Sequence, residues 1–584
     1  MVQSRDFYGP APKEPGRGPM YLPHLVGGLF TGREAELARL DTAFATPEST
    51  VSGVRPVVVH GRGGIGKSTL AAHWAATRRG EGQTVWWIVA DRPAAAEEGL
   101  AGLGAALLGR DATGQPLEAL AEHAFGWLNG HAEWVLVLDD MRRPADAEPV
   151  LARLDGAVEG RVLITTRQDT GWESTARQII ALDVLSREQA VKLLAATVTA
   201  EHPSADLDGA DELCRELGCL PLAIEQASGY LTAASRTPRA YLQTLAAYPA
   251  QAYDHHRAGD DCDRTIARIW HATLDHLNTE APLTETVLRV LAWFAPDQIP
   301  RAVLDGLPDL LAPSDLGGRR FWTRRRHRPA QPEPADDRAV AEAVKRLASH
   351  KMITLSDDGR SINVHRLVQT VARTPTSAGA SDDIDAARRH ATILLDRICT
   401  RDPDEPSGWP LWRALMPHID ALADHAPPDT DTPTTSRLLG NAGSYRQRQG
   451  APTRAITHLQ RALAAALRLQ GEDHPDTLDA RDALANAHLA AGDVEEAIAL
   501  YEQTLAVIVA MRRNDHPEAL DARGNLASAY QVAGDLEQAI ALYELTLADC
   551  RRVLGEDHPT TRTVHDRLRV ALRERGNGGM PSTS

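Results

Sequence analysis

The chain has 584 residues, enough for three to five domains of ordinary size. Hydrophobic residues make up 43% and charged residues 24%, so most of the chain is expected to fold. The net charge of −16 argues against a protein that coats nucleic acid or an anionic membrane. No apolar run reaches the ~18 residues of a membrane span, and no secretory signal is expected in the first 25 residues. The 5 scattered cysteines form no CxxC pair, which predicts thiols in a reducing cytoplasm.

Residues 1–24 are predicted to be a flexible N-terminal extension, and residues 25–180 a domain built on a parallel sheet. Four short apolar runs in this domain alternate with helical stretches, as in βαβ units. A parallel sheet is covered by helices on both faces, so its strands are continuously apolar. The predicted strands are 57–59, 85–88, 135–138 and 162–164.

The segment after the first predicted strand, residues 61–68, has the sequence Gly-Arg-Gly-Gly-Ile-Gly-Lys-Ser and matches GxxxxGK[ST]. Glycines let the backbone wrap phosphates, and the start of the next helix supplies positive potential. We expect Lys67 to reach the β- and γ-phosphates of ATP and Ser68 to ligate Mg²⁺. The alternative is a glycine-rich turn with only a structural role. The residues expected to bind ATP or ADP here are Gly61, Gly63, Gly64, Ile65, Gly66, Lys67, Ser68 and Thr69.

Two acidic residues, Asp139 and Asp140, directly follow the predicted strand 135–138. An acid at the carboxyl end of a strand lies beside the phosphate loop in a doubly wound sheet. We therefore expect Asp139 to hold Mg²⁺ through water, and Asp140 to orient or deprotonate the attacking water. Taken alone, such a pair is more often a solvated turn or a helix cap.

Beyond the sheet, the strand pattern gives way to helices. Residues 181–260 are predicted to be a helical domain. Residues 263–373 combine helices with a strand pair, 352–355 and 362–364, which favours a winged-helix domain. The polar stretch 313–337 inside that domain is predicted to be a mobile loop.

A predicted helical linker, 384–430, leads into a repeat region, 436–576. The repeat has a period of 42 residues, and each unit is expected to contain two amphipathic helices. One helix pair cannot bury its own apolar face, so neighbouring units should stack into a solenoid. The pattern resembles the tetratricopeptide repeats (TPR) of kinesin light chains, which implies a concave face for a protein or peptide partner. The period is marked by His474-Pro475, His516-Pro517 and His558-Pro559.

Four further segments occur in an order that resembles the NB-ARC class of STAND NTPases, switch ATPases of plant resistance proteins, apoptosome proteins and bacterial relatives. They are Phe-Thr-Gly-Arg-Glu at 30–34, Arg-Val-Leu-Ile-Thr-Thr-Arg at 161–167, Leu-Gly-Cys-Leu-Pro-Leu-Ala at 217–223 and Val-His-Arg at 364–366. Positions 363–365 are Asn-Val-His where the family has Met-His-Asp.

The resemblance implies a role for one or two residues of each segment. The backbone at Thr31 and Arg33 is expected to meet adenine, and Pro221 to pack on the adenine ring. Arg167 is placed where a γ-phosphate could be sensed, and His365 where the β-phosphate of ADP is contacted. Each residue has a simpler explanation: Arg167 as an ordinary arginine at a strand end, Pro221 as a helix breaker, and His365 as a half-buried structural histidine.

The resemblance leads to one favoured function and two alternatives. The favoured one is an ATP/ADP-dependent signal-transduction switch with slow, Mg²⁺-dependent ATP hydrolysis. Its repeats would sense a ligand or partner, and its ATP state would oligomerise or engage an effector protein in trans. The first alternative is a DNA-binding regulator that uses the winged helix and the six arginines within 319–328, although nucleic-acid binding is disfavoured. The second is a TPR scaffold with a structural ADP.

Overall fold

The computed structural model describes residues 21–22, 30–45, 54–80, 83–92, 94–154, 160–246, 269–270, 272–274, 276–277, 281, 283–311, 336–356, 358–375, 380–399, 402–512 and 516–577. Residues 1–20 of the predicted extension and the arginine-rich stretch 319–328 lie outside these ranges. The chain divides into two compact units, the first comprising 1–398 with 420–422 and the second 399–419 with 423–584.

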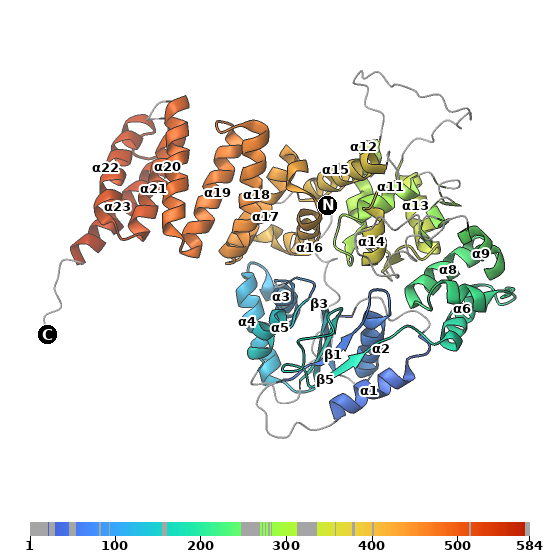
Figure 1. Cartoon of the computed structure of the whole chain (residues 1–584). Helices are drawn as coiled ribbons and strands as arrows, with labels where there is room; N and C mark the ends of the chain where they lie inside the picture. The colour runs from blue at the N-terminus through green and yellow to red at the C-terminus, as the bar shows by residue number, and fades with distance from the viewer. Residues whose placement is uncertain are drawn as a thin grey trace, which may run out of the picture. The chain divides into compact units, whose positions relative to one another are not determined.

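The first unit begins with a five-stranded parallel sheet in the order β2-β3-β4-β1-β5 (Figure 1). The four predicted strands are present, and the α/β fold class is confirmed. Tyr21 extends the sheet beyond β2 through an isolated parallel bridge to Trp86. The strands are β1 Val57–His60, β2 Thr84–Val89, β3 Trp134–Met141, β4 Arg161–Thr166 and β5 Gln178–Ala181.

Helices cover both faces of this sheet. Val58 packs in the cluster under α3, α4 and α5, whereas Val57 and Val59 pack in the cluster under α1 and α2. Side chains alternate along a strand, so a run of valines serves both faces at once. We call the sheet and these helices the sheet subdomain. The helices are α1 Glu34–Ala45, α2 Lys67–Gly80, α3 Ala95–Leu108, α4 Leu117–Gly130 and α5 Pro144–Ala152.

The next four described helices form a helical subdomain, shown in green in Figure 1. Ser186 and Gln189 form a capping box at the start of α6, in which each side chain accepts the other's backbone N–H. Pro221 occupies the first turn of α8, where its missing N–H costs no helical hydrogen bond. The helices are α6 Arg187–Glu201, α7 Ala210–Glu216, α8 Pro221–Ala233 and α9 Pro238–Ala246.

A mixed subdomain follows, consisting of helices α11–α14 and a small antiparallel sheet of order β6-β8-β7. The predicted strand pair forms β7 and β8, while β6 is an addition to the prediction. α15, Ala380–Ile398, packs against this subdomain. The elements of the subdomain are α11 Thr284–Leu291, β6 Ile299–Pro300, α12 Leu307–Leu311, α13 Asp337–Ser349, β7 Thr354–Leu355, β8 Ser361–Asn363 and α14 Arg366–Ala372.

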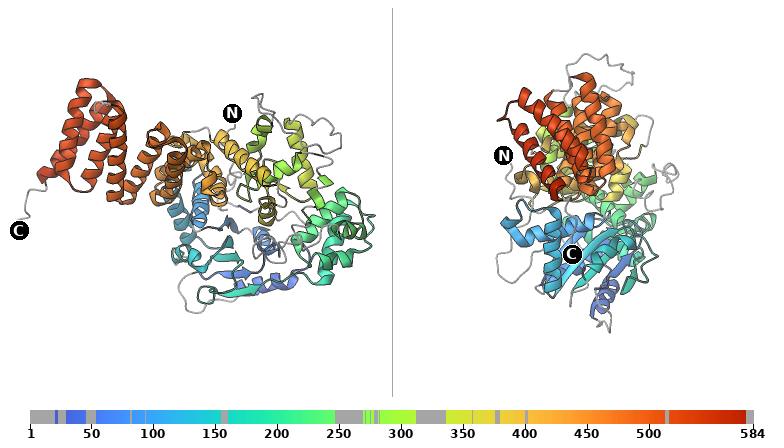
Figure 2. Two further views of the ribbon diagram at one scale, coloured as in Figure 1. Left: turned by 45° about the horizontal axis from the view of Figure 1, so that its top comes forward. Right: turned by 90° about the vertical axis from the view of Figure 1, so that its left-hand side faces the viewer.

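The second unit contains most of α16, Trp409–His425, and the helical repeats. Each repeat helix packs against the next along the chain (Figure 2). Three glycines, Gly450, Gly492 and Gly534, have positive φ and occupy the same position in successive units. The repeat helices are α17 Pro433–Arg448, α18 Pro452–Gln470, α19 Pro475–Ala491, α20 Val494–Met511, α21 Pro517–Val532, α22 Leu536–Val553 and α23 Pro559–Asn577.

The repeated His-Pro pair has a local structural function. In His474, His516 and His558, the ring Nδ1 atom accepts the backbone N–H two residues further on, at 3.2, 3.4 and 3.3 Å. Each histidine therefore caps the N-terminus of the helix that the following proline begins. Each His-Pro pair therefore marks the residue at which the first helix of a unit begins.

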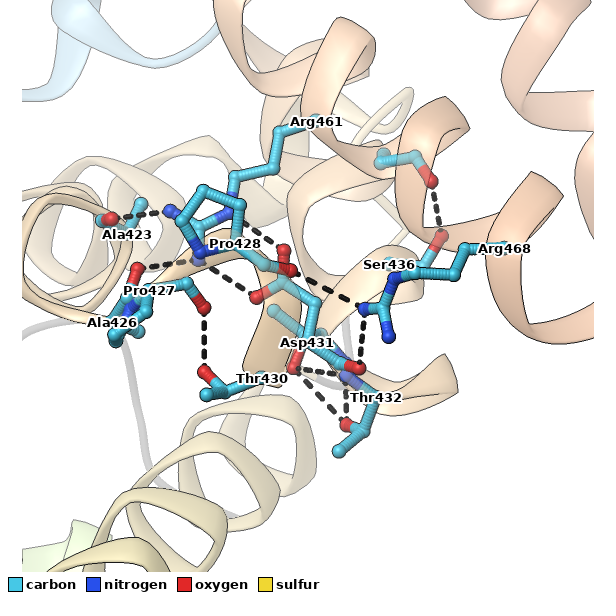
Figure 3. Close-up of polar contacts among 12 residues, drawn as sticks. Ala423, Ala426, Pro427, Pro428, Thr430, Asp431, Thr432, Ser436, Arg461 and Arg468 are labelled. Atoms are coloured by element: carbon cyan, nitrogen blue, oxygen red, sulfur yellow. Dashed lines mark hydrogen bonds and ion pairs between the residues drawn. The ribbon is translucent and has the colours of Figure 1, made fainter.

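Arg461 fixes the loop that precedes the first repeat (Figure 3). Its guanidinium bonds both carboxylate oxygens of Asp431 at 2.7 Å, and the carboxylate is 1% exposed. It also donates to the carbonyl oxygens of Ala423 and Ala426. The buried charge is thus paired and fully hydrogen-bonded, as such a group requires. Among the residues that the structure describes, no helix has both the length and the apolar character needed to cross a bilayer.

Candidate nucleotide-binding site

The phosphate loop lies between β1 and α2, where the sequence predicts it. Gly64 and Gly66 have φ angles of 72° and 93°, a region that glycine enters without strain. A Cβ atom at Gly61 would lie 2.6 Å from the carbonyl oxygen of Leu182, so a side chain there would force the backbone apart. The course of the loop therefore depends on its glycines.

The N-terminus of α2 and Lys67 together make an anion site. α2 begins at Lys67 and carries no acidic residue in its first turn. The first N–H groups of a helix have no intrahelical acceptor, and the helix dipole adds positive potential. The Lys67 Nζ atom donates hydrogen bonds of 2.8 Å to the carbonyl oxygens of Gly61 and Arg62. These groups fit a nucleotide polyphosphate, and Thr69 lies in the same first turn of α2.

Asp139 lies at the carboxyl end of β3 and is 8% exposed. Its Oδ1 atom accepts hydrogen bonds from Ser68 Oγ at 2.8 Å and from Thr165 Oγ1 at 2.5 Å. Among the described residues, no group of three or more His, Cys, Asp or Glu side chains could hold a metal ion. Mg²⁺ commonly uses one or two protein ligands together with phosphate oxygens. Ser68 and Asp139 would hold it in that way.

Asp140 lies in a bulge of β3, because the pairing of β3 with β4 shifts beyond Leu138. Bulges re-aim side chains at the ends of strands. Asp140 has a φ of 57°, and its N–H donates to Thr165 Oγ1 at 2.8 Å. Arg167, which follows β4, places Nε 3.6 Å from Asp140 Oδ1. The proposed sensor arginine and the proposed water-orienting carboxylate are therefore neighbours.

The mixed subdomain reaches the same carboxylate through Arg366, the first residue of α14. One terminal nitrogen of its guanidinium pairs with Asp140 Oδ2, and the other lies 3.3 Å from Asp91 Oδ2. Asp91 lies just beyond the carboxyl end of β2, and Asp140 lies near the carboxyl end of β3. Neither Arg366 nor Asp91 is among the site residues predicted from the sequence.

Both other subdomains contact the phosphate loop. The Leu222 N–H of the helical subdomain donates to the Gly64 carbonyl oxygen at 3.3 Å. Pro221 Cγ lies 3.8 Å from the Cβ position of Gly66. From the mixed subdomain, Leu367 approaches the Cβ positions of Gly63 and Gly64 to 3.5 and 3.3 Å. Pro221 is thus near the loop, although its predicted contact with adenine stays a prediction.

His365 lies directly before α14 and caps it, because its Nδ1 atom accepts the Leu367 N–H at 3.2 Å. This bond fixes the neutral ring with its proton on Nε2. Burial of the ring lowers the pKa of His365 below its usual value, and the positive charges of Arg167 and Lys67 lower it further. Both charges belong to the predicted phosphate site, which supports the predicted location of His365 beside it.

Arg33 has a structural contact that the sequence analysis did not anticipate. Its side chain is buried and donates to the carbonyl oxygens of Ile65 at 3.2 Å and Asp183 at 2.6 Å. It also pairs with Glu36 at 3.0 Å. The side chain therefore braces the phosphate loop against the segment after β5. The expected contacts of the Thr31 and Arg33 backbone with adenine stay predictions.

Asp297 is a further acid that faces this region from the mixed subdomain. Burial, together with the charges of Asp139 and Asp91, raises its pKa to about 7. The signal for Asp91 was available in the sequence, since it follows a predicted strand as Asp139 and Asp140 do. The resemblance at 364–366 already implied that His365 returns to the phosphate site. Nothing in the sequence indicates that Arg366 pairs with the acids at the strand ends or that Asp297 faces them.

The sheet, the glycine loop and the paired acids define a P-loop NTPase fold joined to helical repeats. Residues 47–204 match the NB-ARC domain family. Residues 434–508 and 519–560 match tetratricopeptide repeat families. The chain therefore contains an NB-ARC domain and C-terminal tetratricopeptide repeats, as its sequence motifs predicted.

Two curated relatives cover different shares of the chain. A nucleotide-binding leucine-rich repeat (NLR)-like protein of Hyaloscypha variabilis is 25% identical over 491 residues, 78% of this chain and 46% of that protein. The regulatory protein AfsR of Streptomyces griseus is 31% identical over 279 residues, 47% of this chain and 28% of that protein. The chain thus spans less than half the length of these two relatives.

Among solved structures, a STAND protein with a tetratricopeptide repeat sensor from Pyrococcus horikoshii is 13% identical. The match covers 97% of this chain and 82% of that one, with a TM-score of 0.40.

Proposed function

We propose that this protein is a signal-transduction switch driven by ATP and ADP. The observation that carries the proposal is the contact of two further subdomains with one phosphate loop, through Leu222 and through Leu367. A ligand on the loop would meet residues of all three subdomains. The number of phosphates on the bound nucleotide would therefore affect how the three subdomains pack against one another.

A switch of this kind requires a ligand that binds the two arrangements with different affinity, because equal affinity shifts no equilibrium. ADP would stabilise the closed arrangement through the loop and His365. A γ-phosphate would lie near Arg167 and Asp140, which the closed arrangement occupies with ion pairs. Lys67 must release the carbonyl oxygens of Gly61 and Arg62 to reach the phosphates. ATP would therefore favour opening.

Hydrolysis would be slow and would reset the switch. Ser68 and Asp139 would hold Mg²⁺, which would supply positive charge to the phosphates, and Asp140 would orient the attacking water. The mixed subdomain acts as the family's winged helix. The repeats bind a protein or peptide partner on their concave face and bias the same equilibrium, and the ATP state oligomerises or engages an effector protein.

The test is nucleotide binding by wild type and the Lys67→Ala variant, measured by calorimetry with ADP and with ATP plus Mg²⁺. Removing the charge that faces the β- and γ-phosphates should weaken binding at least tenfold, since charge-assisted hydrogen bonds contribute roughly 1.5–3 kcal/mol. Lys345→Ala, which removes an exposed lysine of α13, is the matched control and should bind as wild type does. Equal affinity in all three proteins would exclude this loop as the site.

The alternative of a scaffold with a structural ADP makes a different prediction. Such a protein would neither exchange labelled ADP nor hydrolyse ATP, with or without its partner. A switch must exchange its nucleotide.

A further inference from the structure

The Asp140 carboxylate is held at both of its oxygens. Arg167 lies 3.6 Å from Oδ1 on one side, and Arg366 pairs with Oδ2 on the other. The backbone adds a third restraint, because the Asp140 N–H is bound to Thr165 Oγ1. The shorter contact is with Arg366, so turning the carboxylate toward another donor costs the ion pair with Arg366.

The two arginines differ in origin. Arg167 belongs to the sheet subdomain, as Asp140 does, so their proximity does not depend on subdomain packing. Arg366 belongs to the mixed subdomain and bridges Asp140 and Asp91, which end adjacent strands. The side chains of Arg366, Asp91 and Asp140 are only 23, 27 and 20% exposed, so solvent screens these pairs weakly. The bridge exists only while the subdomains are closed.

We propose that Arg366 is a positioning residue that withholds Asp140 from the attacking water until the mixed subdomain moves away. This inference rests on the proposed function. An ion pair with Arg366 takes up part of the acceptor capacity of Oδ2 and fixes the direction of the carboxylate, so Asp140 is a poorer partner for the attacking water while the pair lasts. Separation of α14 from the sheet takes Arg366 away from Asp140. It also takes His365 and Leu367, the residues on either side of Arg366, away from the phosphate loop. Opening of the switch and release of Asp140 are thereby a single event.

A purely structural arginine would affect stability alone, whereas this inference predicts faster chemistry on its removal. Arg366→Ala should raise the single-turnover rate of ATP hydrolysis and the dissociation rate of labelled ADP, each on the order of tenfold, a usual size for coupling between sites. Arg366→Lys keeps the charge but cannot bridge two carboxylates, so both rates should lie between those of wild type and Arg366→Ala. Arg338→Ala, at an exposed position of α13, is the control and should match wild type.

A substitution at Asp91 provides a second test of the inference, in which Asp140 and Arg366 are both unchanged. Asp91→Asn should raise both rates less than Arg366→Ala does. The double variant should equal Arg366→Ala alone, because Asp91 acts through Arg366 and the two effects are not additive. Asp91→Asn and Arg366→Lys also keep the inference testable if Arg366→Ala does not fold.

Two outcomes would overturn the inference while leaving the proposed function intact. In one, the variants bind nucleotide but hydrolyse ATP and release ADP at wild-type rates. In the other, ATP hydrolysis slows while ADP release is unchanged, which would make Arg366 a helper of the reaction rather than a restraint on it. Failure of the wild-type protein to bind ADP or ATP in the same titrations would instead overturn the proposed function, and this inference with it.

Discussion

The two ring nitrogens of His365 face different partners: one caps α14, and the other is left as a donor for the predicted phosphate site. Nδ1 accepts the Leu367 N–H and caps α14, which leaves Nε2–H as a donor. The neutral ring therefore already presents a hydrogen bond that a phosphate oxygen could accept. Protonation adds a proton at Nδ1, which removes the acceptor that caps the helix and leaves the Nε2–H donor in place.

We predict that ADP binding takes up a proton at His365. Burial of the ring, together with the positive charges of Arg167 and Lys67, lowers the pKa of His365 to about 4 in the free protein, whereas a bound phosphate would favour the charged ring. Because the bound state then holds the proton more tightly, ADP affinity rises as the pH falls below the pKa of the bound state, and the rise ends near the pKa of about 4 in the free protein. Each pKa unit gained on binding corresponds to at most about a tenfold change.

His365→Gln is the appropriate comparison, because glutamine keeps a donor and does not titrate. ADP itself gains a proton near pH 6, and the variant shares that contribution with wild type. Calorimetric affinities at pH 6, 7 and 8 should therefore change more steeply in wild type than in the variant. Parallel pH profiles would place His365 away from the phosphates.

At the scale of elements, the first repeat depends on one buried ion pair. Asp431 lies in the segment before α17, and Arg461 reaches it from α18. The same guanidinium bonds the carbonyl oxygens that end α16. One side chain thus joins three successive helices of the second unit, in contrast to an exposed ion pair such as Arg569–Asp566 further along the solenoid.

We predict that Arg461→Met destabilises the second unit by about 3–5 kcal/mol, because it leaves a buried carboxylate without a counter-charge. Arg569→Met, which removes an exposed pair with Asp566, should cost about 1 kcal/mol or less. Urea unfolding followed by helical circular dichroism would measure both. Arg461→Met with Asp431→Asn should recover part of the loss. Equal midpoints for the two single variants would show that burial of this pair does not matter.

Local sequence patterns predicted the elements that are long and apolar or that carry a known motif. They did not predict side-chain contacts between subdomains. The four predicted strands are apolar throughout, whereas β5 has only one buried residue and β6 only two residues in all. The phosphate loop and the acids after β3 carry a motif. Arg366 meets Asp140 across 226 positions of sequence. The resemblance at 364–366 implied that His365 returns to the phosphates, but no local pattern indicates that Arg366 pairs with Asp140. Asp91 could have been predicted in the same way as Asp140, because it also follows a predicted strand.

At the scale of the whole molecule, the proposed function links the state of one loop to assembly. A ligand at ~100 times its Kd contributes roughly 2.7 kcal/mol to the form that binds it, enough to reverse a balanced equilibrium. Only a difference in affinity between the two forms has this effect. Because Arg366 holds the closed form through carboxylates near the expected γ-phosphate, ATP and ADP should differ in this respect.

We therefore predict that ATP with Mg²⁺ increases the molecular mass of the protein in solution, while ADP leaves it at the mass of the resting form. Multi-angle light scattering after gel filtration in each nucleotide would measure this. Arg366→Ala should assemble at a lower ATP concentration, because part of the closing free energy is gone. Lys67→Ala should stay at the resting mass in both nucleotides, since it cannot couple phosphate binding to opening. An unchanged mass in every condition, with nucleotide demonstrably bound, would mean that the output passes to an effector without self-assembly.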